Sequence, residues 1–183
     1  MTIRKVQASD AETLRELAER TFRVAWQDEN EPEAFEAYCR ENFSLENVKA
    51  ELAAPGAEFY FAEINDQPIA YLKLNIDRSP NWSDDSKSSD QFRGPALQLE
   101  RIYVVQNIQS QGLGAELLRF TEQRARETGA TWLWLSVWQK SPRTIAFYER
   151  HGFEIFGVET FWVGDDPQPD WLMRKQLINF IAP

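Results

Sequence analysis

Apolar and polar residues along the first third of the chain follow the periods of one strand and three helices. Residues 1–7 alternate in polarity, which predicts a strand. An apolar residue every three or four positions then predicts an amphipathic helix, and Ser9 and Glu12 at its start have the spacing of a capping box. Two further helices are predicted, one over residues 31–42 and one that begins after Ser44 as its N-cap.

The middle of the chain predicts a hairpin followed by a long loop. Residues 57–64 and 67–76 are strand-like segments on either side of Asn65 and Asp66, a pair of residues typical of tight hairpin turns. Residues 77–95 are polar and rich in Ser and Asp, so we expect a loop there. Loops of this length in compact domains are usually functional or disordered.

The second half of the chain alternates strand-like and helix-like patterns. Gly129 and Gly152 stand where two helical patterns stop, and Ser141 with Pro142 has the form of an N-cap and a first helical residue. The predicted strands cover residues 96–105, 131–138, 153–164 and 171–180, the predicted helices residues 111–128 and 142–151, and a polar loop residues 164–170. Together the elements predict one domain of mixed α/β (α+β) class over residues 1–183.

Composition narrows the class of protein. The 183 residues include 20 Lys and Arg against 29 Asp and Glu, a formal net charge of −9. This acidic balance argues against nucleic acid and anionic membranes as partners and permits a cationic small molecule. Cys39 is the only cysteine, so no disulfide within the chain can form, and we expect a buried, inert thiol. The first ten residues lack an apolar leader and no run reaches membrane-spanning length, which predicts a cytoplasmic protein.

The segment around residues 97–120 holds the main candidate for chemistry, because a strand runs through a glycine-bearing turn directly into a helix. The first amides of a helix lack partners and the helix dipole makes that end positive, so glycines there let backbone N–H groups approach an anion. Gly112 and Gly114 fit this use; the alternative is that they only allow close packing of helix on strand. The chain has neither a G-x-x-x-x-G-K-[ST] motif nor a complete G-x-G-x-x-G motif.

Two motifs resemble the GCN5-related N-acetyltransferase superfamily. Gln109, Gly112 and Gly114 match the (Arg/Gln)-x-x-Gly-x-(Gly/Ala) turn of that family, and residues 148–153 match its Y-x-x-x-G-F hallmark. The resemblance implies a mostly antiparallel central sheet of six to seven strands, flanked by helices, with a splay between the fourth and fifth strands. It also implies an enzyme without a metal that moves an acetyl group from acetyl-CoA to a primary amine, by direct attack in a ternary complex.

The same resemblance implies where acetyl-CoA would lie. Its pantetheine arm would pair with backbone groups of Ile102, Tyr103 and Val104, and its diphosphate would rest on amides at the helix start. The residues implied for the diphosphate are Gln109, Ser110, Gln111, Gly112, Leu113, Gly114 and Ala115. Ser141 stands where the family often has an Asn that contacts the pantetheine, and it still offers a hydroxyl. Arg143 is a candidate for a phosphate contact or for a surface ion pair.

Two catalytic roles also follow from the resemblance. Tyr148 matches the tyrosine that donates a proton to the departing sulfur, a role that suits a phenol because it is neutral at physiological pH; its alternative role is that of a core aromatic. An amine attacks only as the free base, so a proton acceptor is needed. Glu100 is the candidate, acting through water, and the alternatives are an exposed carboxylate or an ion-pair partner of Arg101 or Arg143.

Several short segments are more specifically similar to bacterial acetyltransferases of the PaiA type, which are associated with polyamines. Among them are ENFSLE, LERIYV and VWQKSPRTIAFYERHGF. This resemblance implies a spermidine- or spermine-like acceptor, with Asp28, Glu29 and Glu31 as candidate ligands; a solvated acidic helix start is the alternative. A protein, peptide or antibiotic amine as acceptor stays open, as does a coenzyme A-binding regulatory module without turnover. The chain is also a candidate homodimer.

Overall fold

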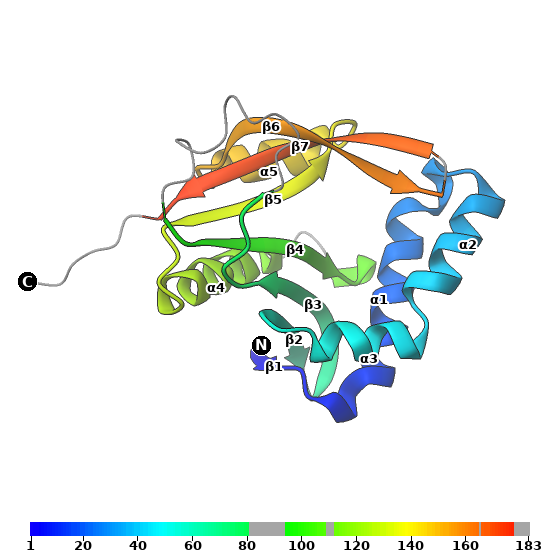
Figure 1. Ribbon diagram of the computed structural model, residues 1–183. Helices are drawn as coiled ribbons and strands as arrows, with labels where there is room; N and C mark the ends of the chain where they lie inside the picture. Colours follow the sequence, from blue (N-terminus) through cyan, green and yellow to red (C-terminus); the bar gives the residue numbers. More distant parts are fainter. Residues whose placement is uncertain (81–93, 109–111, 165, 178–183) are drawn as a thin grey trace, which may run out of the picture.

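A computed structural model describes residues 1–80, 94–108, 112–164 and 166–177 of the protein. Within these residues the centre of the molecule is a seven-stranded sheet with the strand order β1-β2-β3-β4-β5-β7-β6 (Figure 1). The strands are β1 (Thr2–Lys5), β2 (Ala57–Ile64), β3 (Gln67–Asn75), β4 (Ala96–Val104), β5 (Trp132–Trp138), β6 (Glu154–Val163) and β7 (Asp166–Gln176). The α-helices are α1 (Ala11–Trp26), α2 (Pro32–Asn42), α3 (Leu45–Ala53), α4 (Leu113–Glu127) and α5 (Pro142–Arg150).

The sheet opens between its fourth and fifth strands. Neighbouring strands are antiparallel except β4 and β5, which run parallel. The pairing of these two strands is limited to Ala96–Gln98 against Trp132–Trp134. Beyond those residues each strand turns a backbone edge toward the gap. The predicted mixed, mostly antiparallel sheet with a splay at this place is confirmed.

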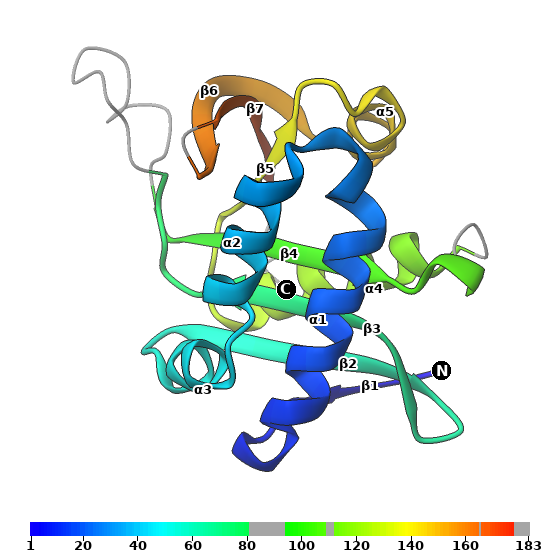
Figure 2. The same ribbon diagram turned by 90° about the vertical axis from the view of Figure 1, so that its right-hand side faces the viewer.

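Helices cover both faces of the sheet. α1, α2 and α3 lie over one face, and α4 and α5 lie over the other (Figure 2). Under α1 and α2, buried aromatic side chains such as Phe35, Phe61 and Tyr71 form one core. On the opposite face, Leu117 and Leu118 of α4 belong to a second core. Because each face is buried by its own helices, the central strands are long runs of buried residues.

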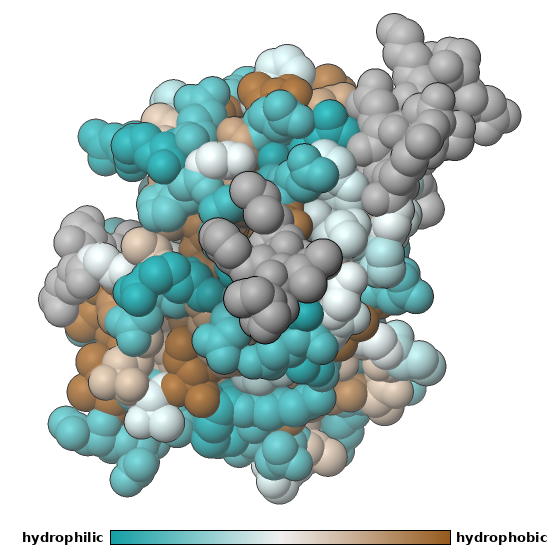
Figure 3. Space-filling model, turned by 90° about the vertical axis from the view of Figure 1, so that its left-hand side faces the viewer, coloured by the Kyte–Doolittle hydropathy of each residue, from teal (hydrophilic) through white to brown (hydrophobic). Residues whose placement is uncertain are grey.

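One side of the molecule is mainly hydrophilic. The side of the molecule in Figure 3 presents chiefly polar residues, with small apolar areas between them. In the part of the chain that the structure describes, no helix has the length and apolar character needed to cross a bilayer. The thiol of Cys39 lies in the interior, where burial raises its pKa, as predicted for an inert side chain.

Turn and cap signals in the sequence locate several element ends correctly. Asn65 and Asp66 adopt φ angles of 50° and 59°, the left-handed conformation that a two-residue hairpin turn requires. The Ser44 hydroxyl accepts a hydrogen bond from the Asn47 amide at 3.2 Å and so caps α3. Gly129 follows α4 with a φ of 79°, a conformation that favours glycine.

The predicted capping box of Ser9 and Glu12 is wrong. A short 3₁₀ turn precedes α1, so Ser9 lies inside this turn and not at a helix start. The Asp10 carboxylate accepts a hydrogen bond from the Gln7 amide at 2.8 Å and takes the capping role instead. Glu12 pairs with Arg15 on the same helix.

The predicted polar loop at residues 164–170 is also wrong. Strand β7 begins at Asp166 and pairs with β6 from its first residue, so most of the predicted loop lies within a strand. The prolines at 167 and 169 are tolerated because this part of β7 has a strand on one side only; pairing with β5 starts at Asp170. Most of the predicted loop 77–95, residues 81–93, lies outside the described residues.

Candidate active site

A bulge in β4 shapes the chain at the point where the sheet opens. Lys73 of β3 pairs with Arg101, but the next residue of β3, Leu74, pairs with Leu99, so Glu100 has no counterpart. A bulge of this kind places two successive side chains on the same side of a strand. Glu100 and Arg101 therefore both reach the polar network that includes Glu51 of α3.

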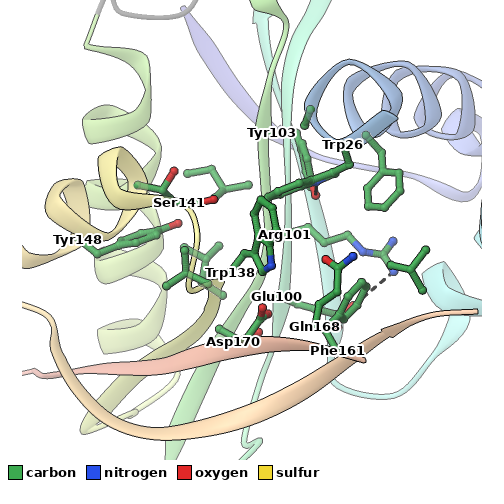
Figure 4. A pocket seen from close by; sticks show the side chains of 18 of the residues that line it. Trp26, Glu100, Arg101, Tyr103, Trp138, Ser141, Tyr148, Phe161, Gln168 and Asp170 are labelled. Atoms are coloured by element: carbon green, nitrogen blue, oxygen red, sulfur yellow. Dashed lines mark hydrogen bonds and ion pairs between the residues drawn. The ribbon is translucent and has the colours of Figure 1, made fainter. Parts of the chain in front are cut away.

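The gap between the diverging strands holds a pocket of about 350 Å³, here called the splay pocket. Strands β4 and β5 form its sides, α1 and α5 contribute side chains from opposite faces of the sheet, and the β6–β7 hairpin closes one side (Figure 4). Its lining consists of Phe22, Ala25, Trp26, Asn30, Leu99, Glu100, Arg101, Ile102, Tyr103, Val104, Ser136, Val137, Trp138, Ser141, Thr144, Tyr148, Phe161, Val163, Gln168 and Asp170.

Tyr148 lies in the splay pocket, and its role as the acid stays a prediction. It shares one face of α5 with Thr144 and with the N-cap residue Ser141, because residues three and four positions apart line up on a helix. The side chain is 4% exposed, and its hydroxyl points into the pocket (Figure 4). Burial raises the pKa of Tyr148, so the phenol is protonated at neutral pH and can donate a hydrogen bond.

The two other cofactor candidates on α5 differ in position. Ser141 is the N-cap of α5 through its backbone, but its side chain makes no capping hydrogen bond, and the hydroxyl faces the pocket. Arg143 lies exposed in the first turn of the helix. Its guanidinium forms no ion pair with any residue that the structure describes. The alternative role of Arg143, a surface ion pair, is thus not seen within this part of the chain.

The start of α4 presents backbone amides that precede the first intrahelical hydrogen bond. Gly112 is the N-cap with a φ of 78°, and the amides of Leu113 to Ala115 precede the first intrahelical bond, from Glu116 to the Gly112 carbonyl. A methyl group on Gly112 would meet no atom within 4 Å, so its left-handed backbone, not a lack of space, calls for glycine. At Gly114 an added Cβ would touch the Phe147 ring at 3.6 Å, an ordinary contact. The predicted ligands Gln109, Ser110 and Gln111 lie outside the described residues.

Glu100 is held by basic and amide groups. Its carboxylate accepts hydrogen bonds from Lys73 at 2.7 Å and from Asn75 at 2.6 Å, and Arg101 lies at 3.4 Å. Although burial works in the opposite direction, the charges of Lys73 and Arg101 hold the pKa of Glu100 below its usual range. The structure thus contains the ion pair between Glu100 and Arg101 that was the alternative role, and a base role for Glu100 stays a prediction.

The acidic residues predicted to bind an acceptor lie outside the pocket lining. Asp28 and Glu29 are exposed in a single 3₁₀ turn between α1 and α2. The Glu31 carboxylate accepts hydrogen bonds from two backbone amides of α2, those of Glu33 at 3.2 Å and Ala34 at 2.8 Å, and caps that helix. Trp26 and Asn30, on either side of the turn, do line the pocket. A role for Asp28 and Glu29 in binding the acceptor at the rim of the pocket therefore stays a prediction.

Contacts between the α1–α2 connection and the β6–β7 hairpin enclose this side of the pocket. The Gln168 amide donates to the Asn30 side-chain oxygen at 2.8 Å. At the hairpin tip, a Cβ on Gly164 would lie 3.3 Å from the Ala34 Cβ, which shows how closely the tip approaches α2. These contacts join segments that are more than a hundred residues apart in the chain.

The sequence analysis did not identify two residues of the pocket, Trp138 and Asp170. Trp138 approaches Trp26 edge-on with ring centroids 5.6 Å apart, and the Trp26 indole donates to the Tyr103 hydroxyl at 3.0 Å. Asp170 lies among these residues in the pocket and is 9% exposed. Burial, with a contribution from the charge of Glu159, raises the pKa of Asp170 to about 7. The available signal was an acid directly before the apolar start of a closing strand, but the segment was interpreted as a loop.

Within the described residues, no group of three or more His, Cys, Asp and Glu side chains is arranged to hold a metal ion. The described lining of the splay pocket offers several donors and acceptors. These are a phenol, hydroxyls, carboxylates and open backbone edges around an apolar gap.

Comparisons with known proteins agree with this geometry. The family model for the acetyltransferase (GNAT) family matches residues 11–153. Over 162 residues the chain is 32% identical to a protein of Lactobacillus delbrueckii subsp. lactis named as an uncharacterized N-acetyltransferase in the pepI 3' region, covering 88% of this chain and 89% of the relative. The fold and its pocket thus define an acetyl-transferring enzyme. The chain belongs to the GNAT family and is an N-acetyltransferase.

Solved structures share the fold at low sequence identity. The PaiA N-acetyltransferase from Thermoplasma acidophilum, in complex with coenzyme A, has a TM-score of 0.72 and 22% identity, with 96% of this chain and 98% of that chain covered. The ribosomal-protein-S18-alanine N-acetyltransferase from Escherichia coli has a TM-score of 0.66 and 18% identity, with 96% and 93% covered. At these identities the likeness shows a common architecture.

Proposed function

We propose that the protein transfers the acetyl group of acetyl-CoA to a primary amine of a polyamine such as spermidine or spermine, by direct attack within a ternary complex. The splay pocket carries this proposal. In it the buried Tyr148 hydroxyl faces the gap between β4 and β5, while Trp26 and Asn30, which flank the exposed acids Asp28 and Glu29 in the chain, line another side. One cavity thus offers access to a thioester and to a cationic amine.

The acetyl-CoA side of the proposal is supported by the open strand edge and the helix start. In the described part of the chain the pairing of β4 with β5 stops at Gln98, so backbone groups of Ile102 and Tyr103 are candidates to bond with the pantetheine amides, together with those of Val104 that the family resemblance implies. The amides of α4, preceded by residues 109–111, suit the diphosphate. Ser141 and Arg143 are candidates for further polar contacts with the coenzyme.

The catalytic side of the proposal is supported by the surroundings of Tyr148. Its raised pKa keeps the phenol protonated, so that it can donate a hydrogen bond to the thiolate that develops beside it. When the C–S bond of the thioester breaks, the electron pair goes to sulfur, and the phenol proton can follow. The amine must arrive at the thioester carbonyl as the free base.

The acceptor side of the proposal is supported by charge and enclosure. The net charge of −9 and the acids of the α1–α2 connection favour a polycation. The contact between Gln168 and Asn30 narrows this side of the pocket, which favours a slender acceptor over a folded protein surface. The PaiA relationship in fold makes spermidine and spermine the first acceptors to test.

An acceptor screen tests the proposal directly. Purified protein and acetyl-CoA are combined with polyamines, aminoglycosides, amino acids and peptides, and thiol release is followed. We expect the highest kcat/KM with spermidine or spermine and intersecting initial-velocity lines. Activity confined to peptides would remove the polyamine acceptor, and parallel lines would remove the ternary complex.

Two variants assign the roles in that screen. Tyr148→Phe should bind coenzyme A as wild type does in calorimetry but turn over roughly 100-fold more slowly, because only the acid is lost. The double variant Asp28→Asn, Glu29→Gln should raise KM for spermidine and leave KM for a monoamine unchanged. Equal effects on both amines would place these acids outside acceptor binding.

Light scattering and cell fractionation test the predicted homodimer and cytoplasmic location.

A further inference from the structure

Asp170 occupies an unusual position for a carboxylate. Strand β7 lies between β5 and β6, and the cross-strand neighbours of Asp170 are Trp138 and Glu159. The residue is 9% exposed and lines the splay pocket (Figure 4). In the described part of the chain, no hydrogen bond or ion pair engages its carboxylate. Burying an unpaired charge is costly, so this site favours a ligand that brings a proton or a positive charge.

Glu100 is the natural comparison because it lines the same pocket. Lys73 and Asn75 bind its two oxygens at 2.7 and 2.6 Å, and Arg101 adds a second positive charge. A carboxylate that is already neutralised in this way is a weak proton acceptor. The pocket therefore contains one satisfied carboxylate and one unsatisfied carboxylate.

We propose that Asp170 is the catalytic base that accepts the proton of the acceptor ammonium group in the splay pocket. This inference rests on the proposed function, since it concerns the amine that the enzyme acetylates. The aromatic side chains Trp26 and Trp138 lie in the same pocket and offer ring faces to the cation on its way to Asp170.

The charged and titratable groups around Asp170 set its affinity for a proton. Glu159 of β6 stands directly opposite, and β4 contributes Glu100, Arg101 and Tyr103 to the pocket. From α5 comes Tyr148, and beyond β5 the Lys140 ammonium lies 5.5 Å from the centre of the Trp138 ring. Burial and the charge of Glu159 dominate and raise the pKa of Asp170 to about 7, close to the working pH of a general base.

The proton balance of the proposed step is simple. Asp170 takes one proton from the ammonium group, and the freed nitrogen lone pair forms the C–N bond while the carbonyl π electrons move to oxygen. As that oxygen re-forms the double bond, the C–S bond breaks and its electrons go to sulfur. Sulfur takes the Tyr148 phenol proton, and the phenolate takes the second proton shed by nitrogen. Asp170 later releases its proton to solvent, so the net products are the amide, coenzyme A and one proton.

Kinetics of matched variants test this role. With spermidine as acceptor, wild-type kcat/KM should rise with pH through about 7 and then level off. Asp170→Asn should lower kcat/KM at pH 8 at least 100-fold and lose the plateau above pH 7, because its rate then follows the small fraction of free amine, which keeps increasing with pH. Coenzyme A binding in calorimetry should be unchanged. Glu159→Gln should move the rise to lower pH, because one negative charge beside Asp170 is removed. Glu100→Gln should keep the rise whatever its effect on the maximal rate.

A weakly basic acceptor supplies a second readout. Trifluoroethylamine is already deprotonated near neutral pH, so its acetylation needs no removal of an ammonium proton. The defect of Asp170→Asn should be at least tenfold smaller with this amine than with spermidine or phenylethylamine. An equal defect with all three amines, or a plateau above pH 7 that persists in Asp170→Asn with spermidine, would overturn the base role.

A measurement without any acceptor separates this inference from the proposed function. Carbon-13 NMR of protein labelled at aspartate carboxyls, with Asp170→Asn used for assignment, follows the titration of this one group. We expect a midpoint near pH 7 that falls in Glu159→Gln. A midpoint below pH 5 would overturn the proposal even if spermidine is acetylated. Failure of the amine screen with a midpoint near 7 would count against the acceptor instead.

Discussion

Asp170 and Glu100 show how differently one pocket treats two carboxylates. Glu100 has two cations and an amide donor within reach, which lower its pKa despite burial. Asp170 has Trp138 on one side and Glu159 on the other, which leaves it with a raised pKa. Both residues are acidic and both lie on strands, so the groups that the fold brings beside each carboxylate distinguish them.

The raised pKa of Asp170 predicts a pH-dependent cost to folding. Between its ordinary value near 3.9 and about 7, the folded state binds a proton that the unfolded state releases. Stability therefore falls as pH rises through this window, by about 2 to 4 kcal/mol in total. We expect Asp170→Asn to be more stable than wild type by this amount at pH 8 and nearly equal at pH 4, as measured by urea unfolding.

Asp166 provides the matched control on the same strand, because its side chain is exposed. Asp166→Asn should change the free energy of unfolding by no more than about 0.5 kcal/mol at either pH. A stability gain of Asp170→Asn that is the same at pH 4 and pH 8 would contradict the assigned cause.

The helix α4 carries a left-handed glycine at each end. Gly112 at its start and Gly129 after its end have φ angles of 78° and 79°. A Cβ at either position would meet no atom within 4 Å. Substitution thus introduces backbone strain without a clash at both ends, while only the start of the helix presents amides to the proposed diphosphate.

This symmetry yields a paired prediction. Gly112→Ala and Gly129→Ala should each lower the free energy of unfolding by about 1 kcal/mol, because both force a side chain into the left-handed region. Only Gly112→Ala should also weaken coenzyme A binding, by several-fold in isothermal titration, since it disturbs the amides of Leu113 and its neighbours. Equal coenzyme A affinity in the two variants would mean that the glycines serve only the helix ends.

A charged cluster fastens the outer half of the sheet to α4. The Glu58 carboxylate on β2 accepts hydrogen bonds from Arg124 of α4 at 2.7 and 2.9 Å, from Lys5 of β1 at 2.8 Å and from the Tyr60 hydroxyl at 2.7 Å. The bond from Arg124 is the largest influence that lowers the pKa of Glu58 to about 2. The cluster joins three elements distant in the chain.

Low pH should therefore reduce the free energy of unfolding through protonation of Glu58. Because its folded pKa lies below the ordinary value near 4.3, its stabilisation is complete above that pH and is lost as pH falls toward about 2. Glu58→Gln should lower the free energy of unfolding by about 2 kcal/mol at pH 7 and by less at pH 3. Glu127→Gln, which removes the exposed second partner of Arg124, should cost at most about 0.5 kcal/mol. A constant difference between Glu58→Gln and wild type over this range would contradict the prediction.

Much of the architecture could be predicted from local patterns. The hairpin at Asn65 and Asp66, the cap at Ser44 and the glycine after α4 are short-range signals that depend on a few neighbouring residues. The polar stretch before Asp170 was misjudged because prolines and acids normally mark loops, and only the absence of a second strand partner permits them in β7.

The site was predictable only in part, for a similar reason. Tyr148 and the α4 start lie in sequence motifs whose residues act together at short spacing. The bulge at Glu100 depends on the register with β3, and no property of β4 alone reveals it. Asp170 reaches the pocket because β7 inserts between β5 and β6, a strand order that the chain sequence does not state.

Amphipathic pattern was enough to predict a mixed α/β domain, and two short motifs were enough to predict an acetyltransferase fold through their resemblance to a known family, because these features are set by residues within a few turns of one another. The ionisation of each carboxylate depended on packing, since desolvation and charge come from strands distant in the chain. Lys73 and Arg101 neutralise Glu100, whereas Trp138 and Glu159 leave Asp170 without a counter-charge. The tertiary structure thus decided that Glu100 forms an ion pair and that Asp170 is available to accept a proton.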